Sequence, residues 1–383
     1  MTNISQSSVL KAAMAAFAAA ILGCSPGDGS KELDAGRAAY EARDFKKAER
    51  LFLKSAQLAP QNVDALVYLA RVKLDVGEVE EAQGWIAKAA ELDGEAADVR
   101  LLGAQIAWHL KEYGEAAKLF TLVASDAKLP PETVSDAWAG LGIVEMTRGS
   151  SHLARVDFLR AIKINRRNAA AWYHLGLLYR DAPFGYLEAA LEQMEIFVRL
   201  DAAASPRVQK TQRSIIPGLK ESIARATADR PGADKRNSSL CASAISKAEA
   251  AWKKGAFKDA RHAYQEAFSA DALSYPAALG LAKAYLKTDA SKDGQRKALD
   301  YYRQACSLRP GAVSTFLAAG ELASSLGFYA QAVEFHSRAV AANPSSIPAI
   351  DGLIKALRKV GGRQKDAAAY QAYRDMIARP RGK

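Results

Sequence analysis

The side chains that could carry out acid–base, nucleophilic or metal chemistry are scattered along this 383-residue chain. The five histidines follow no metal-ligand or nucleophile–base spacing, and no Walker-type glycine loop or Gly-x-Ser-x-Gly turn occurs. These histidines are His109, His152, His174, His262 and His336. Adjacent carboxylates such as Glu80 and Glu81 have the spacing of an ordinary exposed helix face. We therefore expect no catalytic site, no cofactor and no metal ion, and the sequence predicts that the protein is not an enzyme.

One cysteine lies in a context that predicts chemical modification. Cys24 follows the apolar run 12–22, which is shorter than the roughly 20 residues of a membrane-spanning helix and has the length of a secretory signal. The order Ile21-Leu22-Gly23-Cys24 resembles the lipobox of bacterial lipoproteins. In that family the signal is removed before the cysteine, which then carries acyl chains. The resemblance implies a signal peptide over 1–23 and lipid on Cys24. Because Ser25 follows, it also implies attachment to the periplasmic face of the outer membrane.

The residues after Cys24 bear on this interpretation. Residues 24–30 are rich in Ser, Gly and Pro, a composition typical of a flexible polar tether. The alternative is an unprocessed cytoplasmic protein in which the apolar run is a buried helix with an incidental cysteine. A polar tether directly after the run argues against a packed helix that continues.

The two other cysteines, Cys241 and Cys306, have no metal-site spacing. An oxidising compartment would permit a disulfide between them. Cys306 follows Ala305 on the packing face of an expected helix, which favours a buried free thiol.

The elements that position these side chains repeat along the chain. Alanine recurs at an interval of 34 residues at Ala48, Ala82 and Ala116. The same frame continues through Ala154, Ala260, Ala298 and Ala332. A bulky residue follows four positions later and a small residue generally seven positions later, which places all three on one helix face. A period near 34 predicts paired-helix solenoid repeats, which bind partners and seldom perform chemistry themselves.

The repeat columns resemble the tetratricopeptide repeat family. The best matches are Trp138…Leu141-Gly142…Gly149…Ala154…Phe158…Ala161, Trp172…Leu175-Gly176…Tyr179 and Tyr329…Ala332…Phe335…Ala339…Pro344. The resemblance implies an all-α superhelical solenoid of antiparallel helix pairs, with about eight repeats and a closing helix over 363–378. We assign five repeats to 31–201 and three repeats with the closing helix to 241–380. The segment 202–240, punctuated by Pro206, Pro217 and Pro231, breaks the frame, and we expect two short helices in it.

In this family the first helix of each pair lines a concave surface, and the inward positions of the first block define a candidate groove. Aromatic, aliphatic and arginine side chains there would suit a peptide that carries an acidic group. We predict that the partner-binding residues are Arg37, Tyr40, Arg71, Leu101, Gln105, Trp108, Tyr173 and Arg180. Asn62 and Asn168 lie at capping positions, so the family's carboxylate clamp is not expected. The alternative is that Trp108 and Tyr173 only pack against neighbouring repeats.

The net charge of +11 is concentrated in two segments. Residues 202–240 carry eight basic and three acidic side chains. Residues 355–383 carry nine basic and two acidic side chains. An exported protein rarely meets nucleic acid, so we do not expect a nucleic-acid partner. The sequence favours a lipid-anchored periplasmic scaffold that binds a protein or peptide in envelope or secretion assembly. The main rival is a protein that binds an anionic glycan or lipid through these basic segments.

Overall fold

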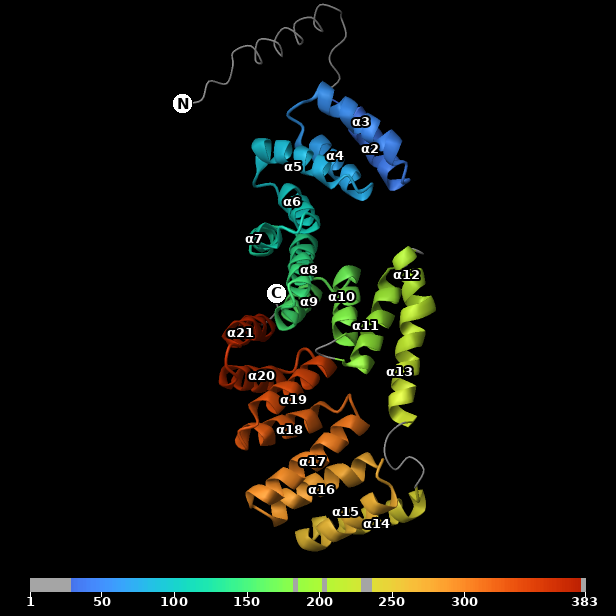
Figure 1. The fold of residues 1–383 in the computed structure, drawn as a ribbon, viewed down its shortest axis with the longest axis vertical. Helices are drawn as coiled ribbons and strands as arrows, with labels where there is room; N and C mark the ends of the chain where they lie inside the picture. Colours follow the sequence, from blue (N-terminus) through green and yellow to red (C-terminus); the bar gives the residue numbers. More distant parts are fainter. Residues whose placement is uncertain (1–28, 182–184, 202–204, 229–235, 380–383) are drawn as a thin grey trace, which may run out of the picture. The chain divides into compact units, whose positions relative to one another are not determined.

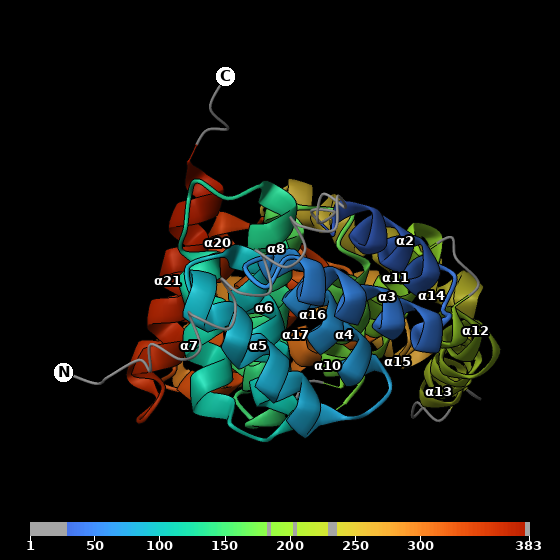
Figure 2. The same cartoon turned by 90° about the horizontal axis from the view of Figure 1, so that it is seen from above.

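The computed structural model describes residues 29–181, 185–201, 205–228 and 236–379, and every regular element in these ranges is a helix. Successive helices form antiparallel hairpins, of which α2 and α3 are the first (Figures 1 and 2). In chain order the helices are α2 (Ser30–Glu41), α3 (Phe45–Leu58), α4 (Val63–Asp75), α5 (Val79–Asp93), α6 (Ala97–His109), α7 (Tyr113–Ala124), α8 (Pro131–Thr147), α9 (Ser151–Ile164), α10 (Ala169–Arg180), α11 (Leu187–Leu200), α12 (Pro206–Lys210), the π-helix η1 (Thr211–Ile215), α13 (Ile216–Ala228), α14 (Ser238–Lys253), α15 (Phe257–Ala270), α16 (Tyr275–Thr288), α17 (Lys292–Leu308), α18 (Val313–Ser325), α19 (Tyr329–Ala342), α20 (Ile347–Lys359) and α21 (Gln364–Ala378). The architecture is the predicted all-α repeat solenoid.

Local sequence signals set the helix ends. Asn62 and Asn168 accept hydrogen bonds from the backbone N–H of Ala65 and Ala171, at 3.3 and 3.0 Å, so both cap first helices as predicted. The glycines expected between the two helices of a pair adopt positive φ, for example 89° at Gly77. A residue without Cβ adopts this conformation without strain.

The repeat columns form the core. The alanines of the 34-residue frame are fully buried wherever they occur, from Ala48 to Ala332. In the last of these repeats His336 takes the place of the bulky residue. It is a full member of the core, because only 2% of His336 is exposed. Its ring fills the space between Gly320 and Gly352, where a Cβ would come within 2.6 and 2.3 Å of the imidazole.

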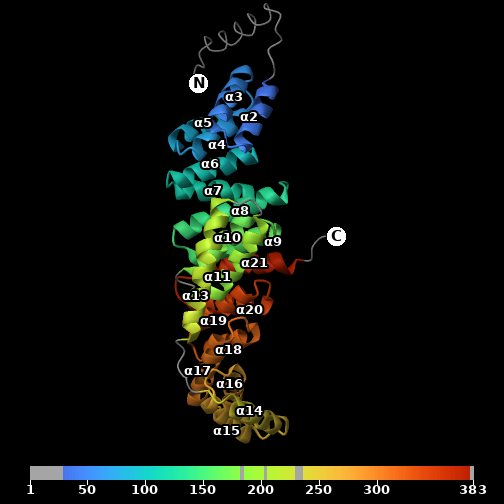
Figure 3. The ribbon, with the colours of Figure 1, turned by 90° about the vertical axis from the view of Figure 1, so that its right-hand side faces the viewer.

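The chain forms two compact units, Met1–Val144 and Glu145–Lys383, which we describe separately as unit 1 and unit 2. In unit 2 the hairpins α14–α15, α16–α17 and α18–α19 stack in succession (Figure 3). The closing helix α21 then packs against α9, beside which it lies in Figures 1 and 3. The last helix of the predicted block 241–380 therefore contacts a helix of the predicted block 31–201.

The segment between the blocks is helical from Pro206 to Ala228. We expected Pro217 to separate two short helices, because proline lacks a backbone donor. Instead, the π-helix η1 directly precedes α13, and the helical segment continues through the proline. π-Helices are rare and occur mostly as single turns inside α-helices, as η1 does here.

The remaining expectations from the sequence concern cysteines and the membrane. Cys241 and Cys306 are both buried free thiols, as favoured above for Cys306. Residues 1–23 and Cys24 lie outside the described residues. None of the helices that the structure describes combines the length and apolarity needed to cross a bilayer.

Candidate functional site

Two predicted groove arginines of unit 1 meet at one aromatic ring. The guanidinium carbon of Arg37, on α2, lies 5.2 Å from the centre of the Tyr68 ring, and that of Arg71, on α4, lies 5.8 Å from it. Tyr68 is held by a stacked contact with Phe52, at 4.9 Å between centroids, and by the edge of Tyr40 at 6.1 Å. We call Arg37, Tyr40, Tyr68 and Arg71 the Tyr68 cluster. Three of its four members were predicted.

Tyr68 itself was missed by the sequence analysis. On α4 only Arg71 was predicted, and Val67, directly before Tyr68, is only 5% exposed and belongs to the core. Tyr68 lies three residues before Arg71, and residues three apart share a helix face. The Tyr-x-x-Arg spacing was therefore the available signal.

The two arginines of the cluster differ in their partners. Arg37 donates to Asp64 at 2.7 Å and lies 3.5 Å from Asp34, so its charge is balanced within the protein. Arg71 makes no hydrogen bond or ion pair with any residue that the structure describes, whereas the Nε atoms of both arginines are buried without a partner. A buried donor of a charged group is costly to leave unsatisfied. Arg71 is thus available for an incoming acceptor.

Tyr40 forms the boundary of the cluster. Its hydroxyl donates a short hydrogen bond to Asp75 on α4. Burial, followed by this bond, raises the pKa of Tyr40 to about 12, so the phenol stays protonated. Tyr40 and Asp75 also line a hollow of about 260 Å³ together with Glu41, Arg43 and Phe45. The site therefore combines aromatic faces, one unpaired cation and an adjoining open space, which suits binding of an acidic segment.

The other predicted residues of unit 1 lie on α6. Leu101 and Trp108 are partly buried against the core cluster of Phe120 and Val144, and Trp108 meets His109 edge-on at 4.9 Å. Gln105 is exposed. Trp108 thus packs against the core while remaining partly exposed, and its role in binding stays a prediction.

The remaining two predicted residues belong to α10 of unit 2. Tyr173 packs against Phe197 at 5.0 Å between centroids, with the Arg207 guanidinium 5.1 Å from its ring. Arg180 donates two hydrogen bonds to the neighbouring Asp181, at 2.7 and 2.9 Å. Arg180 is therefore already neutralised, so it is a weaker candidate than Arg71 for an acidic partner.

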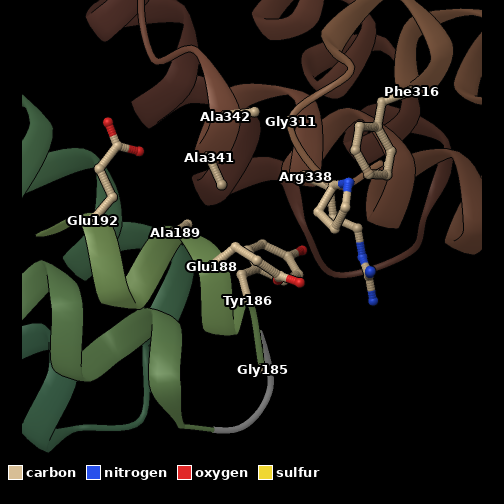
Figure 4. Close-up of a pocket in the computed structure, with 11 residues that line it drawn as sticks. Gly185, Tyr186, Glu188, Ala189, Glu192, Gly311, Phe316, Arg338, Ala341 and Ala342 are labelled. Atoms are coloured by element: carbon tan, nitrogen blue, oxygen red, sulfur yellow. The ribbon is translucent and has the colours of Figure 1, made fainter. Parts of the chain in front are cut away.

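Unit 2 also contains a small cavity of about 140 Å³ between α11 and the α18–α19 hairpin (Figure 4). The Arg338 guanidinium lies 5.2 Å from the ring of Tyr186 and pairs with Glu334 at 3.1 Å. Phe316 forms an apolar wall. The volume suits a single side chain rather than a bound segment. The hollow beside Tyr40 in unit 1, at about 260 Å³, is larger than this cavity.

The comparisons with known proteins agree with the repeat architecture. Residues 32–106 match the sequence profile described as tetratricopeptide repeat, which extends from α2 into α6 and includes the whole Tyr68 cluster. No curated protein matches the sequence.

Similar solved structures include three with low sequence identity. One is titled a functional characterization of pilF from Pseudomonas aeruginosa, with 18% identity, a TM-score of 0.40 and coverage of 53% of this chain and 93% of that chain. For MamA from Desulfovibrio magneticus RS-1, the identity is 13% and the TM-score is 0.37, and the match covers 47% of this chain and 98% of that chain. For the APC/C hetero-tetramer Cut9-Hcn1, the identity is 13% and the TM-score is 0.34, and the match covers 92% of this chain and 79% of that chain.

Proposed function

We propose that this protein is a lipid-anchored periplasmic scaffold that binds an acidic segment of a protein partner at the Tyr68 cluster. The observation that carries the binding part is Arg71, a cation without an ion-pair partner in the described residues, placed beside the half-buried ring of Tyr68. The anchoring part rests on the sequence around Cys24. Attachment to the outer membrane would fix where in the envelope the partner is captured.

The Tyr68 cluster supports a particular binding mode. A carboxylate that approaches Arg71 can accept hydrogen bonds from N–H groups of its guanidinium fork. The adjoining Tyr68 and Tyr40 rings offer apolar area to the residues that flank this carboxylate. We expect recognition of Asp or Glu next to an apolar or aromatic residue, with Arg37 held in place by Asp64.

Selection of peptides from a random library displayed against the purified chain tests this proposal. We expect enrichment of acidic peptides, and a loss of affinity of about 1–3 kcal/mol when an enriched peptide is measured against Arg71→Glu, as for an interface hot spot. Arg71→Lys should recover only part of the affinity, because lysine lacks the planar fork.

The matched control is Arg213→Glu, the same change at an exposed arginine of η1 in unit 2. It should leave peptide affinity unchanged, and circular dichroism should show unaltered helix content in all variants. Equal losses in Arg71→Glu and Arg213→Glu would show that net charge rather than the Tyr68 cluster governs binding, and would refute the proposal.

A further inference from the structure

Unit 1 exposes an apolar hollow on its second helices, α3 and α5. The hollow measures about 370 Å³. It is lined by Leu53, Ala56, Gln57, Pro60, Leu66, Trp85, Lys88, Glu91 and Leu92. Leu92 is 38% exposed, and Leu58, next to Gln57 on α3, is 36% exposed. None of these residues belongs to the Tyr68 cluster, so the hollow is a separate surface.

Trp85 and Lys88 give this surface an amphipathic character. The Lys88 ammonium lies 4.1 Å from the centre of the Trp85 ring, one helical turn away on α5. Trp and Lys are side chains that combine an apolar body with a polar end, and both are favoured at membrane–water interfaces. Leu92, seven residues after Trp85, shares the same face of α5.

The adjoining solvent-facing stripe of α3 is basic. Lys46, Arg50 and Lys54 follow one another at intervals of four residues and are all exposed. Lys46, Lys47 and Arg50 form no ion pair with any described residue, whereas Lys54 pairs with Glu32 at 2.7 Å. Three uncompensated cations beside an apolar hollow complement an anionic surface with an apolar interior.

The start of the described chain lies against α3. The hydroxyl of Ser55, on the buried side of α3, donates a hydrogen bond of 2.8 Å to the carbonyl oxygen of Gly29. Cys24 is five residues before Gly29, so the chain between them spans at most about 18 Å. A lipid on Cys24 would therefore lie within reach of α3.

From these observations we infer that the face formed by α3 and α5 binds the surface of an anionic phospholipid bilayer. We call this face, defined by Leu53, Leu58, Trp85, Leu92 and the cations of α3, the α3–α5 face. Its apolar side chains enter the headgroup region, and Lys46, Lys47 and Arg50 contact lipid phosphates. The inference rests on the proposed anchor for the position of the bilayer. It adds that the anchored chain is held in one orientation, with the Tyr68 cluster left accessible.

An environment-sensitive fluorophore on the full-length lipidated protein tests the inference. Gln57→Cys places a nitrobenzoxadiazole label at the hollow, and Gln83→Cys places it on the opposite side of α5, where Gln83 is exposed. Cys241 and Cys306 are buried and should not react. In vesicles of phosphatidylcholine and phosphatidylglycerol, we expect a blue shift and quenching by nitroxide lipids only for the label at position 57.

A charge variant separates membrane binding from other contacts. Lys46→Glu with Arg50→Glu should reduce flotation of the unlipidated full-length chain with the same vesicles at least about tenfold, since each basic residue near an anionic surface contributes about 1 kcal/mol. If protein that incorporates a fatty-acid analogue shows water-like emission from the label at position 57, membrane binding by the α3–α5 face is wrong, whereas the proposed lipid anchor is supported.

Two further outcomes are decisive. If no fatty acid is incorporated, the proposed anchor is wrong, and flotation of the unlipidated chain alone tests the α3–α5 face. Flotation that depends on Lys46 and Arg50 would support membrane binding by this face, and absence of flotation would overturn it. A blue shift at position 57 that requires an added soluble protein, and not lipid, would identify a protein contact and overturn the membrane assignment.

Discussion

Arg155 on α9 donates a hydrogen bond from Nε to the hydroxyl of Tyr370 on α21, 215 residues later in the chain. Arg155 is fully buried, and its Nη1 and Nη2 donate to the carbonyl and hydroxyl oxygens of Ser337 on α19, at 3.1 and 3.2 Å. The Tyr370 ring lies 5.1 Å from the guanidinium carbon. A buried charge is tolerated only when its donors are satisfied. The hydrogen bonds to Tyr370 and Ser337 therefore join the C-terminal helices α19 and α21 to α9 within unit 2.

Removing the Tyr370 hydroxyl should weaken this closure. We expect Tyr370→Phe to lower the stability of unit 2 by about 1.5–3 kcal/mol, because it leaves a donor of a buried cation unsatisfied. Urea unfolding followed by hydrogen exchange in α9 and α21 measures the effect. The control is Tyr373→Phe, which removes a neutral bond of 3.2 Å to the Pro344 carbonyl and should cost about 1 kcal/mol. Combining Tyr370→Phe with Arg155→Met should cost less than the sum of the single changes.

The buried His336 predicts acid sensitivity. Burial, with a smaller contribution from Lys355, lowers its pKa from 6.5 to about 4. Between these values the unfolded chain binds a proton that the folded chain does not, so stability falls as pH decreases from 6.5 to 4. We expect His336→Phe to remove this contribution, which amounts to about 2 kcal/mol at pH 5. Phenylalanine occupies the equivalent position at Phe52 and packs there against Gly36, so the substitution should fit.

The comparison of urea midpoints at pH 5 and pH 7.5 measures this effect. His152 and His174, whose pKa values burial lowers to about 2 and about 4, remain in both proteins and cancel in the difference. The control is His262→Phe at an exposed site on α15, which should leave the pH dependence as in the parent. An unchanged pH dependence in His336→Phe would contradict the prediction.

The repeat frame was readable from sequence because each repeat uses the same local rules. The alanine columns, turn glycines and capping asparagines act within about 34 residues, and the structure places them as predicted. Contacts outside the frame could not be read in this way. Nothing in the periodicity relates Arg155 to Tyr370, or pairs Arg180 with Asp181 rather than with a ligand. Likewise, Tyr68 could not be identified from the helix register, because its contacts with Arg37 and Arg71 depend on how α2 packs against α4.

Lipid attachment is tested directly at Cys24. We expect a fatty-acid analogue to label the protein, and Cys24→Ala to abolish labelling and yield an uncleaved precursor or a soluble periplasmic form. Cys306→Ala is the control, because Cys306 is buried and its pKa is raised to about 12 by burial, so its thiol should take no acyl group. Labelling that persists in Cys24→Ala would place the lipid elsewhere and remove the basis for outer-membrane localisation.

Arg236 tests whether the basic segment 202–240 binds a ligand or supports the fold. Its Nε and Nη2 donate to the Asp271 carboxylate, the latter bond measuring 3.0 Å, and the Asp271 side chain is only 6% exposed. Arg236→Gln should therefore destabilise the α14–α15 hairpin measurably, because the buried Asp271 carboxylate loses its charged donor. Arg225→Gln removes the same charge from an exposed pair with Glu221 on one helix and should cost only about 0.3–0.5 kcal/mol.

The two variants change net charge equally, so binding to a soluble anionic polymer separates the roles. A structural Arg236 predicts that both variants bind the polymer alike, weakly and with strong dependence on salt, since exposed charges are screened over about 10 Å at 0.1 M. Hydrogen exchange in α14 and α15 should meanwhile accelerate only in Arg236→Gln. If polymer affinity instead fell sharply in Arg236→Gln while exchange stayed as in the parent, this arginine would be a polymer ligand. The basic segment would then replace the Tyr68 cluster as the leading functional surface.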